Sequence, residues 1–208
     1  MYPFIGQYIY PPRPSKGALT LGAPHFQKLE QDSAWIAQAK LNGQNTLIYC
    51  TQEGVRLYNR HAKPRRFKLS DEQQAFFQDR YDRMKMPLVF NAEALDRKKS
   101  YRGQLYVYDM LVMQGAWLVG TSYRQRLQMM KFVLGPLKVG PFELAWQTRV
   151  DSIWMARSAW GNWDKMMAQH RHLEIFEGLM VKNTQSKLKP GLSPENNQRW
   201  CFRCRKPA

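Results

Sequence analysis

The stretch Trp35–Tyr49, WIAQAKLNGQNTLIY, holds the feature on which both fold and function depend. Within it, Lys40 follows an alternating, half-apolar run and precedes Asn42-Gly43, and a second β-rich run lies beyond that dipeptide. Asn-Gly between two such runs is typical of a two-residue hairpin turn, because both residues tolerate positive φ. The stretch therefore predicts a β-hairpin with Lys40 beside its turn. On this window alone, a solvated lysine at a sheet edge is the simpler interpretation, so the role of Lys40 depends on residues downstream.

The composition predicts a folded and strongly basic protein. The chain has 208 residues, of which 44% are hydrophobic and 13% aromatic, enough for a sizeable core in one domain or two small ones. Its 32 lysines and arginines against 16 acidic residues give a formal net charge of +16. A globular chain this basic is expected to bind a polyanion, and nucleic acid is the first candidate.

The sequence carries no membrane or secretion signal that we recognise. No window of about eighteen apolar residues is present, and the N-terminus has neither a basic start nor an unbroken apolar segment. We therefore expect a cytoplasmic protein with no membrane partner. The three cysteines are Cys50, Cys201 and Cys204, an odd number. Their single C-x-x-C pair is only a weak signal for a zinc site, so we expect free thiols.

Periodicity along the chain indicates one α+β domain at 34–208, preceded by an arm and lead-in at 1–33 with an extended proline-rich start at 11–14. Strands are predicted at 34–40, 46–51, 55–59, 87–95, 103–112, 175–183 and 199–206. Helices are predicted at 71–84, with Ser70 or Asp71 as the cap, at 123–134, and at 151–170 with three packing tryptophans. Hairpin strands interleaved with segregated helices indicate antiparallel sheets. Because no Gly-rich phosphate loop is present, a bound nucleotide would be held by side chains that project from sheets.

Five segments carry residues that could together serve one reaction. Each has an ordinary explanation when taken singly, such as an exposed strand carboxylate or a solvated lysine. The segments are KLNG from Lys40, LYNRHAK with Arg60, FNAEAL with Glu93, LYVYDML with Tyr108, and EGLMVKN with Glu177 and Lys182. Jointly they offer a nucleophile, phosphate-binding cations, metal ligands and a flat surface for a base.

In this order the segments resemble the covalent nucleotidyltransferase superfamily of polynucleotide ligases and messenger-RNA capping enzymes. The resemblance extends from Trp35 to Arg205, and DMLVMQG followed by YRQRLQMM is also similar to ATP-dependent DNA ligases. It implies an adenylation domain of antiparallel sheets flanked by helices, in which Lys40 takes AMP or GMP as a phosphoramide. Asn42 stands where the superfamily usually has Asp.

The resemblance implies nucleotide-binding roles that the chemistry of each side chain supports. An amine attacks phosphorus only when unprotonated, so Lys40 needs nearby positive charge, from Arg60, Lys182 or a metal, or desolvation. Tyr108 offers a flat face to the adenine, with core packing as the competing role. The Gln38 amide could accept from an adenine or donate to a guanine, which leaves ATP as the first choice and GTP open.

Mg²⁺ is the metal that the resemblance implies, and it prefers oxygen ligands. Glu177 is expected to bind it, and Glu93 either binds it too or contacts the ribose. Asn45 occupies a nucleotide-binding position where DNA ligases tend to have Arg and several RNA ligases have Asn, so it gives a mixed signal about the substrate.

Nucleic-acid contacts are expected from two basic segments. The first is the loop RHAKPRRFK, with Arg65, Arg66 and Lys68. The second is the late strand, where Arg203 and Arg205 share a face and could clamp phosphate, although the superfamily spacing aligns only after a one-residue slip. The chain ends at Ala208, so the oligonucleotide-binding barrel that follows this domain in most DNA ligases is expected to be absent.

The sequence therefore predicts an ATP-dependent DNA ligase-like enzyme that seals nicks through a lysyl-AMP intermediate. We expect a monomer whose first partner is nicked duplex DNA, with a partner chain able to supply the missing clamp. An RNA ligase of the same superfamily is the second hypothesis, and a non-catalytic nucleic-acid-binding protein with the same fold is the third. Simultaneous retention of Lys40, Glu93, Glu177 and Lys182 favours an enzyme, because binding alone needs basic charge and no paired carboxylates.

Overall fold

A computed structural model describes residues 2–96 and 99–207, and it has the α+β class that the sequence predicts. The strands form a nine-stranded, a four-stranded and a two-stranded sheet. In chain order the elements are β1 (Tyr2–Pro3), β2 (Arg13–Pro14), β3 (Ala18–Leu19), α1 (Pro24–Gln31), β4 (Trp35–Leu41), β5 (Gln44–Thr51), β6 (Gly54–Asn59), α2 (Asp71–Met84), β7 (Leu88–Leu95), η1 (Lys99–Tyr101), β8 (Gln104–Met113), β9 (Ala116–Trp117), α3 (Tyr123–Leu134), β10 (Lys138–Val139), η2 (Pro141–Glu143), β11 (Ala145–Gln147), β12 (Ile153–Ala156), α4 (Trp163–His170), β13 (Phe176–Asn183), β14 (Asn197–Gln198) and β15 (Cys201–Arg205).

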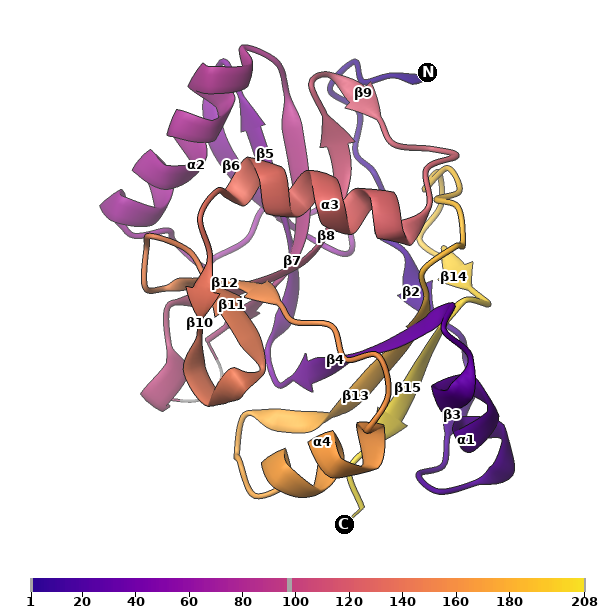
Figure 1. Cartoon of the computed structure of the whole chain (residues 1–208). Helices are drawn as coiled ribbons and strands as arrows, with labels where there is room; N and C mark the ends of the chain where they lie inside the picture. The colour runs from indigo at the N-terminus through magenta and orange to yellow at the C-terminus, as the bar shows by residue number, and fades with distance from the viewer. Residues whose placement is uncertain (1, 97–98, 208) are drawn as a thin grey trace.

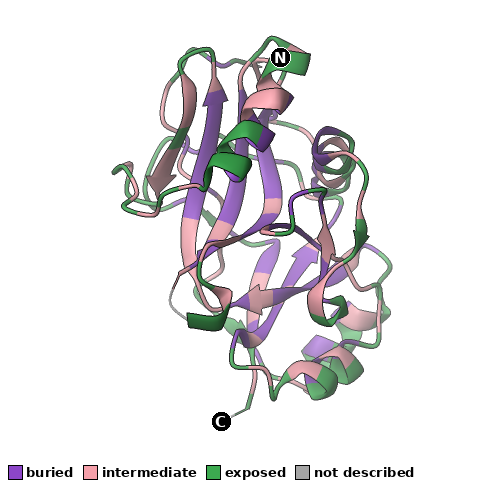
Figure 2. Ribbon diagram, turned by 90° about the vertical axis from the view of Figure 1, so that its left-hand side faces the viewer, coloured by how far each residue is buried: buried purple, intermediate pink, exposed green. Residues whose placement is uncertain are grey.

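The large sheet has the order β10-β11-β12-β8-β7-β5-β6, with β1 and β9 attached beside β8. Its pairs are antiparallel except β12 with β8, which is parallel. Helices α2 and α3 pack on this sheet (Figure 1). The central strands are buried along most of their length (Figure 2), because both the helices and the second sheet exclude water from them.

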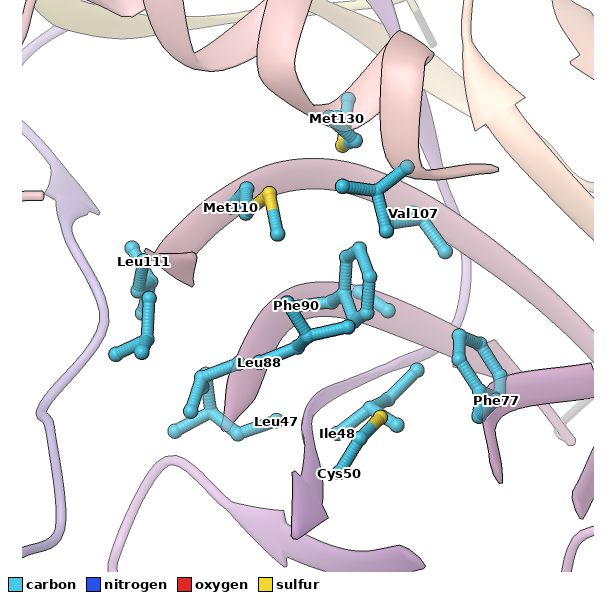
Figure 3. Close-up of a cluster of buried hydrophobic side chains, with 14 of the residues drawn as sticks. Leu47, Ile48, Cys50, Phe77, Leu88, Phe90, Val107, Met110, Leu111 and Met130 are labelled. Atoms are coloured by element: carbon cyan, nitrogen blue, oxygen red, sulfur yellow. The ribbon is translucent and has the colours of Figure 1, made fainter. Parts of the chain in front are cut away.

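The core of the large sheet is made by apolar side chains that alternate along its strands. Met130 of α3 lies over Met110 of β8, while Phe77 of α2 approaches the side chains of β5 and β7 (Figure 3). Phe77 and Phe90 have ring centroids 5.6 Å apart. Each such side chain stabilises the fold by about 1.5–3 kcal/mol when fully buried.

The small sheet has the order β3-β15-β13-β4, with β13 antiparallel to both β15 and β4. Helices α1 and α4 lie beside it (Figure 1), and Phe26 of α1 meets Trp163 of α4 edge-on at 5.5 Å between ring centroids. Leu179 and Val181 on β13 are fully buried in this second core. The alternate residues of β13 therefore face the other way, toward the large sheet.

Two helices begin and end where the sequence predicts. Ser70 before α2 and Ser122 before α3 each accept a hydrogen bond from the backbone N–H of the third helical residue, Gln73 and Gln125. Each glutamine side chain accepts in return from the serine N–H, which completes a capping box. Of the two predicted caps for α2, Ser70 is the one used.

The predicted hairpin at Lys40 is wrong. Strands β4 and β5 belong to different sheets, and the chain crosses between them at Asn42-Gly43, where neither residue has a positive φ. Glycine is needed there for space, since a Cβ on Gly43 would lie 2.6 Å from the carbonyl oxygen of Ala94 and 2.6 Å from Cγ of Glu93. The chain thus passes from the small sheet to the large sheet just after Lys40, which stays near the end of β4.

The predicted helix at 151–170 is also wrong over its first half. Ile153–Ala156 form β12, which pairs with β8, and only Trp163–His170 are helical. Gly161 and Asn162 have φ of 108° and 55°, so the backbone there is left-handed and a continuous helix is impossible. The tryptophan spacing suggested a helix, but pairing of β12 with the largely buried β8 stabilises the strand instead.

The N-terminal segment packs closely on both sheets. β1 pairs with β9, β2 with β14 and β3 with β15, while Phe26 and Leu29 of the unpredicted helix α1 enter the second core. All three cysteines are buried free thiols. In the part of the chain that the structure describes, no helix has the length and apolar character needed to cross a membrane.

Candidate active site

A cavity of about 470 Å³ lies between the two sheets, and most of the predicted site residues line it. The small sheet contributes side chains from β4, β13 and β15, the large sheet from β5, β7 and β8, and the N-terminal segment contributes 11–14. The predicted residues in its wall are Gln38, Lys40, Asn45, Arg60, Arg65, Glu93, Tyr108, Glu177, Lys182 and Arg203. The chain motifs therefore meet in one place although they are far apart in sequence.

Lys40 and Glu177 form an ion pair at the cavity wall. Lys40 pairs with Gly178 and Leu41 with Phe176, so Glu177 is an extra residue that forms a β-bulge. Gly178 has a φ of 135° and a Cβ there would lie 2.2 Å from the carbonyl oxygen of Cys204, so only glycine fits. The Glu-Gly dipeptide thus turns the carboxylate toward the lysine.

Lys182 is buried in a polar cluster behind Lys40. Its Nζ donates to Oε1 of Gln38 at 2.7 Å and to the hydroxyl of Tyr123 at 2.8 Å, and lies 4.8 Å from the ring centroid of Tyr108. Burial lowers the pKa of Lys182 below its usual 10.5, because the charged form loses hydration. The Gln38 amide, which the sequence analysis assigned to the base, also donates to Ser158 at 3.2 Å and is thus hydrogen-bonded on both sides within the protein.

Tyr108 is held by two amides from neighbouring strands. Nδ2 of Asn45 donates to the Tyr108 hydroxyl and to Oδ1 of Asn91, both at 2.7 Å, and the hydroxyl donates to the same oxygen at 3.1 Å. The β7–β8 register shifts here so that Tyr108 has no partner opposite, and Tyr108 and Asp109 both line the cavity. Burial raises the pKa of Tyr108 well above 10.0, so its hydroxyl stays protonated. Oδ1 of Asn45 is buried without a partner among the described residues, which leaves one acceptor for a ligand.

The cavity carries an excess of positive charge. Asp109 is neutralised by Arg126 in a buried two-pronged pair with N···O distances of 2.8 and 3.1 Å, and Arg65 pairs with Asp96 at 3.2 Å. The other cationic side chains in the wall are Arg13, Lys40, Arg60, Lys182 and Arg203, against the two carboxylates of Glu93 and Glu177. An anionic ligand would balance this excess.

The five residues predicted to contact nucleic acid lie in different surroundings. The Arg65 side chain is only 9% exposed and paired, because the loop folds back on β5, so it is not available at the surface. Arg66 and Lys68 are exposed, but they do not line the cavity. Of the late-strand pair, Arg203 lines the cavity while Arg205 lies exposed at the end of β15.

Two residues of the cavity wall, and one residue that contacts the wall from behind, were missed by the sequence analysis. Asn91 lies two positions before Glu93 on the same strand face, so alternation along FNAEAL was an available signal. Tyr123 was assigned only as the start of a helix, although its hydroxyl accepts from Lys182. Arg13 lies in the proline-rich arm, where no periodicity points to a site.

The carboxylates fit a metal shared with a phosphate ligand. Glu93 and Glu177 reach the same cavity from opposite sheets, and Mg²⁺ is usually bound by one or two carboxylates with phosphate and water oxygens. Among residues 2–96 and 99–207, no group of three or more His, Cys, Asp or Glu could form an all-protein site. A metal held by these two carboxylates would need further oxygen ligands, such as those of phosphate or water.

No protein-family model matches the sequence, and no curated protein matches it significantly. Solved structures do match the fold. DNA ligase D from a mycobacterium, in complex with ATP and MES, superposes with a TM-score of 0.62 at 16% identity over 95% of this chain and 60% of that one. The ligase domain of LigD from M. tuberculosis gives 0.58 at 17% identity over 95% and 57%. A Lig E DNA ligase, described as binding DNA with a minimal scaffold, gives 0.50 at 14% over 91% and 68%.

The chain therefore has the fold of the adenylation domain of ATP-dependent DNA ligases, as the motif order predicted. It spans less than two thirds of the length of the two ligase D structures.

Proposed function

We propose that the protein is an ATP-dependent nucleotidyltransferase of the polynucleotide ligase type, with Lys40 as its nucleophile. The observation that carries the proposal is the convergence of Lys40, Glu177 and Lys182 from one sheet with Glu93 from the other, in a cavity with excess positive charge. The fold likeness to ligase domains, one of them solved with ATP, supports the choice of nucleotide.

In the first step the neutral amine of Lys40 attacks the α-phosphorus of ATP. A P–N bond forms, the bond from the α-phosphorus to the oxygen of the β-phosphate breaks, and pyrophosphate leaves with the bond electrons. The nitrogen then releases one proton to water to give the phosphoramide. The Lys40 amine is held in the ion pair with Glu177, so that contact must open before the nitrogen can attack. Mg²⁺, when bound, would compensate phosphate charge and compete with Lys40 for the Glu177 carboxylate.

The other cavity residues position the nucleotide. Arg60 and Lys182 are cations suited to phosphate oxygens, and Lys182 would have to leave Gln38 to reach them. Such a movement would free the Gln38 oxygen to accept from the amino group of adenine. Glu93 and the unpartnered Oδ1 of Asn45 are candidates for the ribose hydroxyls.

In the later steps the AMP passes to the 5′-phosphate at a break, and the 3′-hydroxyl displaces AMP to seal the strand. Nicked duplex DNA is our first choice of substrate and RNA our second. This domain would hold such a substrate mainly through exposed cations, for which Arg66 and Lys68 are candidates. A partner chain could add a clamp.

The test is incubation with α-labelled ATP or GTP and Mg²⁺, followed by a denaturing gel. We expect label on the wild type and on Lys28→Ala, a matched change at an exposed lysine of α1, and none on Lys40→Ala. Nucleic-acid binding should be nearly unchanged in Lys40→Ala, because one charge is a small part of a net charge of +16. Label that persists on Lys40→Ala would refute the assignment.

Substrate choice needs the pre-adenylylated enzyme. Nicked DNA, nicked RNA and single-stranded RNA would be compared at one salt concentration. Sealing of nicked DNA is expected. Sealing of single-stranded RNA alone would favour the RNA ligase hypothesis, and no label from either nucleotide would favour a non-catalytic binding protein.

A further inference from the structure

The N-terminal arm, Tyr8–Ser15, crosses the cavity and is fastened to both sheets. At one end, the Tyr8 hydroxyl donates to the carbonyl of Asn59 on β6 at 2.6 Å. At the other, the Ser15 N–H donates to the carbonyl of Cys201 on β15 at 2.8 Å. The arm therefore bridges the large and small sheets at the rim of the cavity.

The backbone of the arm is fixed near its middle. The N–H of Tyr10 donates to Gly191 at 2.9 Å, and that of Arg13 donates to Asn196 at 2.8 Å. Prolines at 11, 12 and 14 restrict φ on both sides of Arg13. Because the backbone around Arg13 is already ordered, binding of a ligand by Arg13 costs little backbone conformational entropy.

Arg13 and Arg203 both line the cavity and have buried donors without acceptors. Nη2 of Arg13 and Nε of Arg203 are shielded from solvent and make no hydrogen bond to any described residue. Neither arginine has a carboxylate partner within residues 2–96 and 99–207, whereas Arg65 and Arg126 in the same region are both paired. A buried charged donor without a partner is costly, so an anion that fills the cavity would remove that cost.

The two arginines are also connected through the arm. Nη2 of Arg203 reaches the carbonyl oxygen of Ser15 at 3.5 Å, two residues after Arg13. β15 carries Arg203 and also accepts the Ser15 N–H at the carbonyl of Cys201, so the arm that presents Arg13 is attached to the strand that presents Arg203.

We propose that Arg13 and Arg203 form a phosphate-binding subsite in the cavity that Lys40 also lines, so that the N-terminal arm is part of the ligand site. Guanidinium groups suit phosphate because their planar N–H donors match two oxygens at once. That the phosphate belongs to a nucleotide rests on the proposed function. It is either the terminal phosphates of the nucleoside triphosphate or the 5′-phosphate of the strand to be joined.

The experiment uses the full chain and the variants Arg13→Gln, Arg13→Lys and Lys16→Gln. Lys16 is the matched control, because it is exposed on the same segment and does not line the cavity. Binding of inorganic tripolyphosphate and of AMP is measured by calorimetry. Binding of a nicked duplex with a 5′-phosphate is compared with that of a 5′-hydroxyl duplex. Thermal melting checks that each variant is folded.

If the subsite holds the triphosphate, Arg13→Gln should weaken tripolyphosphate binding about 10- to 100-fold and leave AMP binding within about 2-fold. If it holds the strand end, Arg13→Gln should instead abolish the preference for the 5′-phosphorylated duplex. Arg13→Lys should be intermediate in either case, because it keeps the charge and loses the paired donors.

The proposal is overturned if Arg13→Gln matches Lys16→Gln with all of these probes. Tripolyphosphate and duplex binding do not require the covalent step. Failure of the wild type to label with ATP would therefore contradict the proposed function while leaving this test intact.

Discussion

Replacement of Gly43 by Ala should destabilise the fold and displace Glu93. The added Cβ would lie 2.6 Å from the carbonyl oxygen of Ala94, 2.6 Å from Cγ of Glu93 and 2.9 Å from Cδ2 of Leu95. Non-bonded carbons sit comfortably at about 3.5–4.0 Å, so β7 or the crossover must shift by an appreciable fraction of an ångström. Glu93 lines the cavity, so the strain falls on the proposed site.

The expected cost can be bounded from general behaviour. Forcing an extra methyl group into a packed interior costs about 1–3 kcal/mol. For a chain of this size, each kcal/mol lowers Tm by about 2–4 °C, so the loss should be about 2–12 °C. The same change also lowers the entropy of the unfolded chain, which stabilises by up to about 1 kcal/mol and must be subtracted.

Gly17→Ala is the matched control for that subtraction. Gly17 also lacks a positive φ, and a Cβ there would meet nothing within 4 Å. The difference in unfolding free energy between the two variants, from thermal and urea unfolding, therefore measures the cost of the steric contacts at residue 43. Adenylylation rates measured below the melting range report on the displacement of Glu93. Equal stability of the two variants would refute the packing argument.

Three further outcomes are expected. Glu177→Gln should stay folded but become adenylylated slowly, and its rate should be lowest relative to the wild type at low Mg²⁺, because an amide is a poor ligand for this cation. Rates equal to those of the wild type at low Mg²⁺ would contradict a role of Glu177 in metal binding. Burial lowers the pKa of Lys182, so the unfolded chain binds more protons than the folded chain at pH values between the folded-state pKa and 10.5. The free energy of unfolding of the wild type should therefore rise with pH over that interval, relative to that of Lys182→Met, and urea titrations showing a constant difference would contradict this. Replacing Arg66 and Lys68 together with Gln should lower the salt slope of duplex binding by about two units, whereas Lys28→Gln should leave it unchanged.

Local signals predicted the elements whose ends are decided by neighbouring residues. The bounds of α2 and α3 follow from Ser70 and Ser122 with a glutamine three positions later, a pattern that needs no tertiary information. Most strands of the two sheets were also predicted to within about two residues, because their apolar residues alternate. Pairing partners were not available from such signals. Asn42-Gly43 marked a change of direction correctly, yet whether the next strand pairs with the last is decided by the sheets around it.

The helix predicted at 151–170 was wrong for the same reason, because strand pairing cannot be read from local signals. Trp154, Trp160 and Trp163 suit a helical spacing, but Trp154 lies opposite Tyr106 in the parallel pairing of β12 with β8. A largely buried β8 needs hydrogen-bonding partners on both edges, and 153–156 supplies one of them. The N-terminal arm is a further case, since only the meeting of two sheets brings Arg13 into a cavity.

The site itself shows where alternation fails for a physical reason. On β13, Lys182 and Met180 face the cavity, so regular alternation would turn Glu177 away from it, onto the side where Leu179 and Val181 enter the core. The bulge at Glu177 reverses that direction, and Gly178 is the residue that permits it. On β8, the irregularity at Tyr108 likewise lets two consecutive residues, Tyr108 and Asp109, line one cavity. The motif EGLMVKN is therefore informative where periodicity fails, because its glycine permits a bulge. The bulge redirects the side chain of Glu177, which pairs with Lys40.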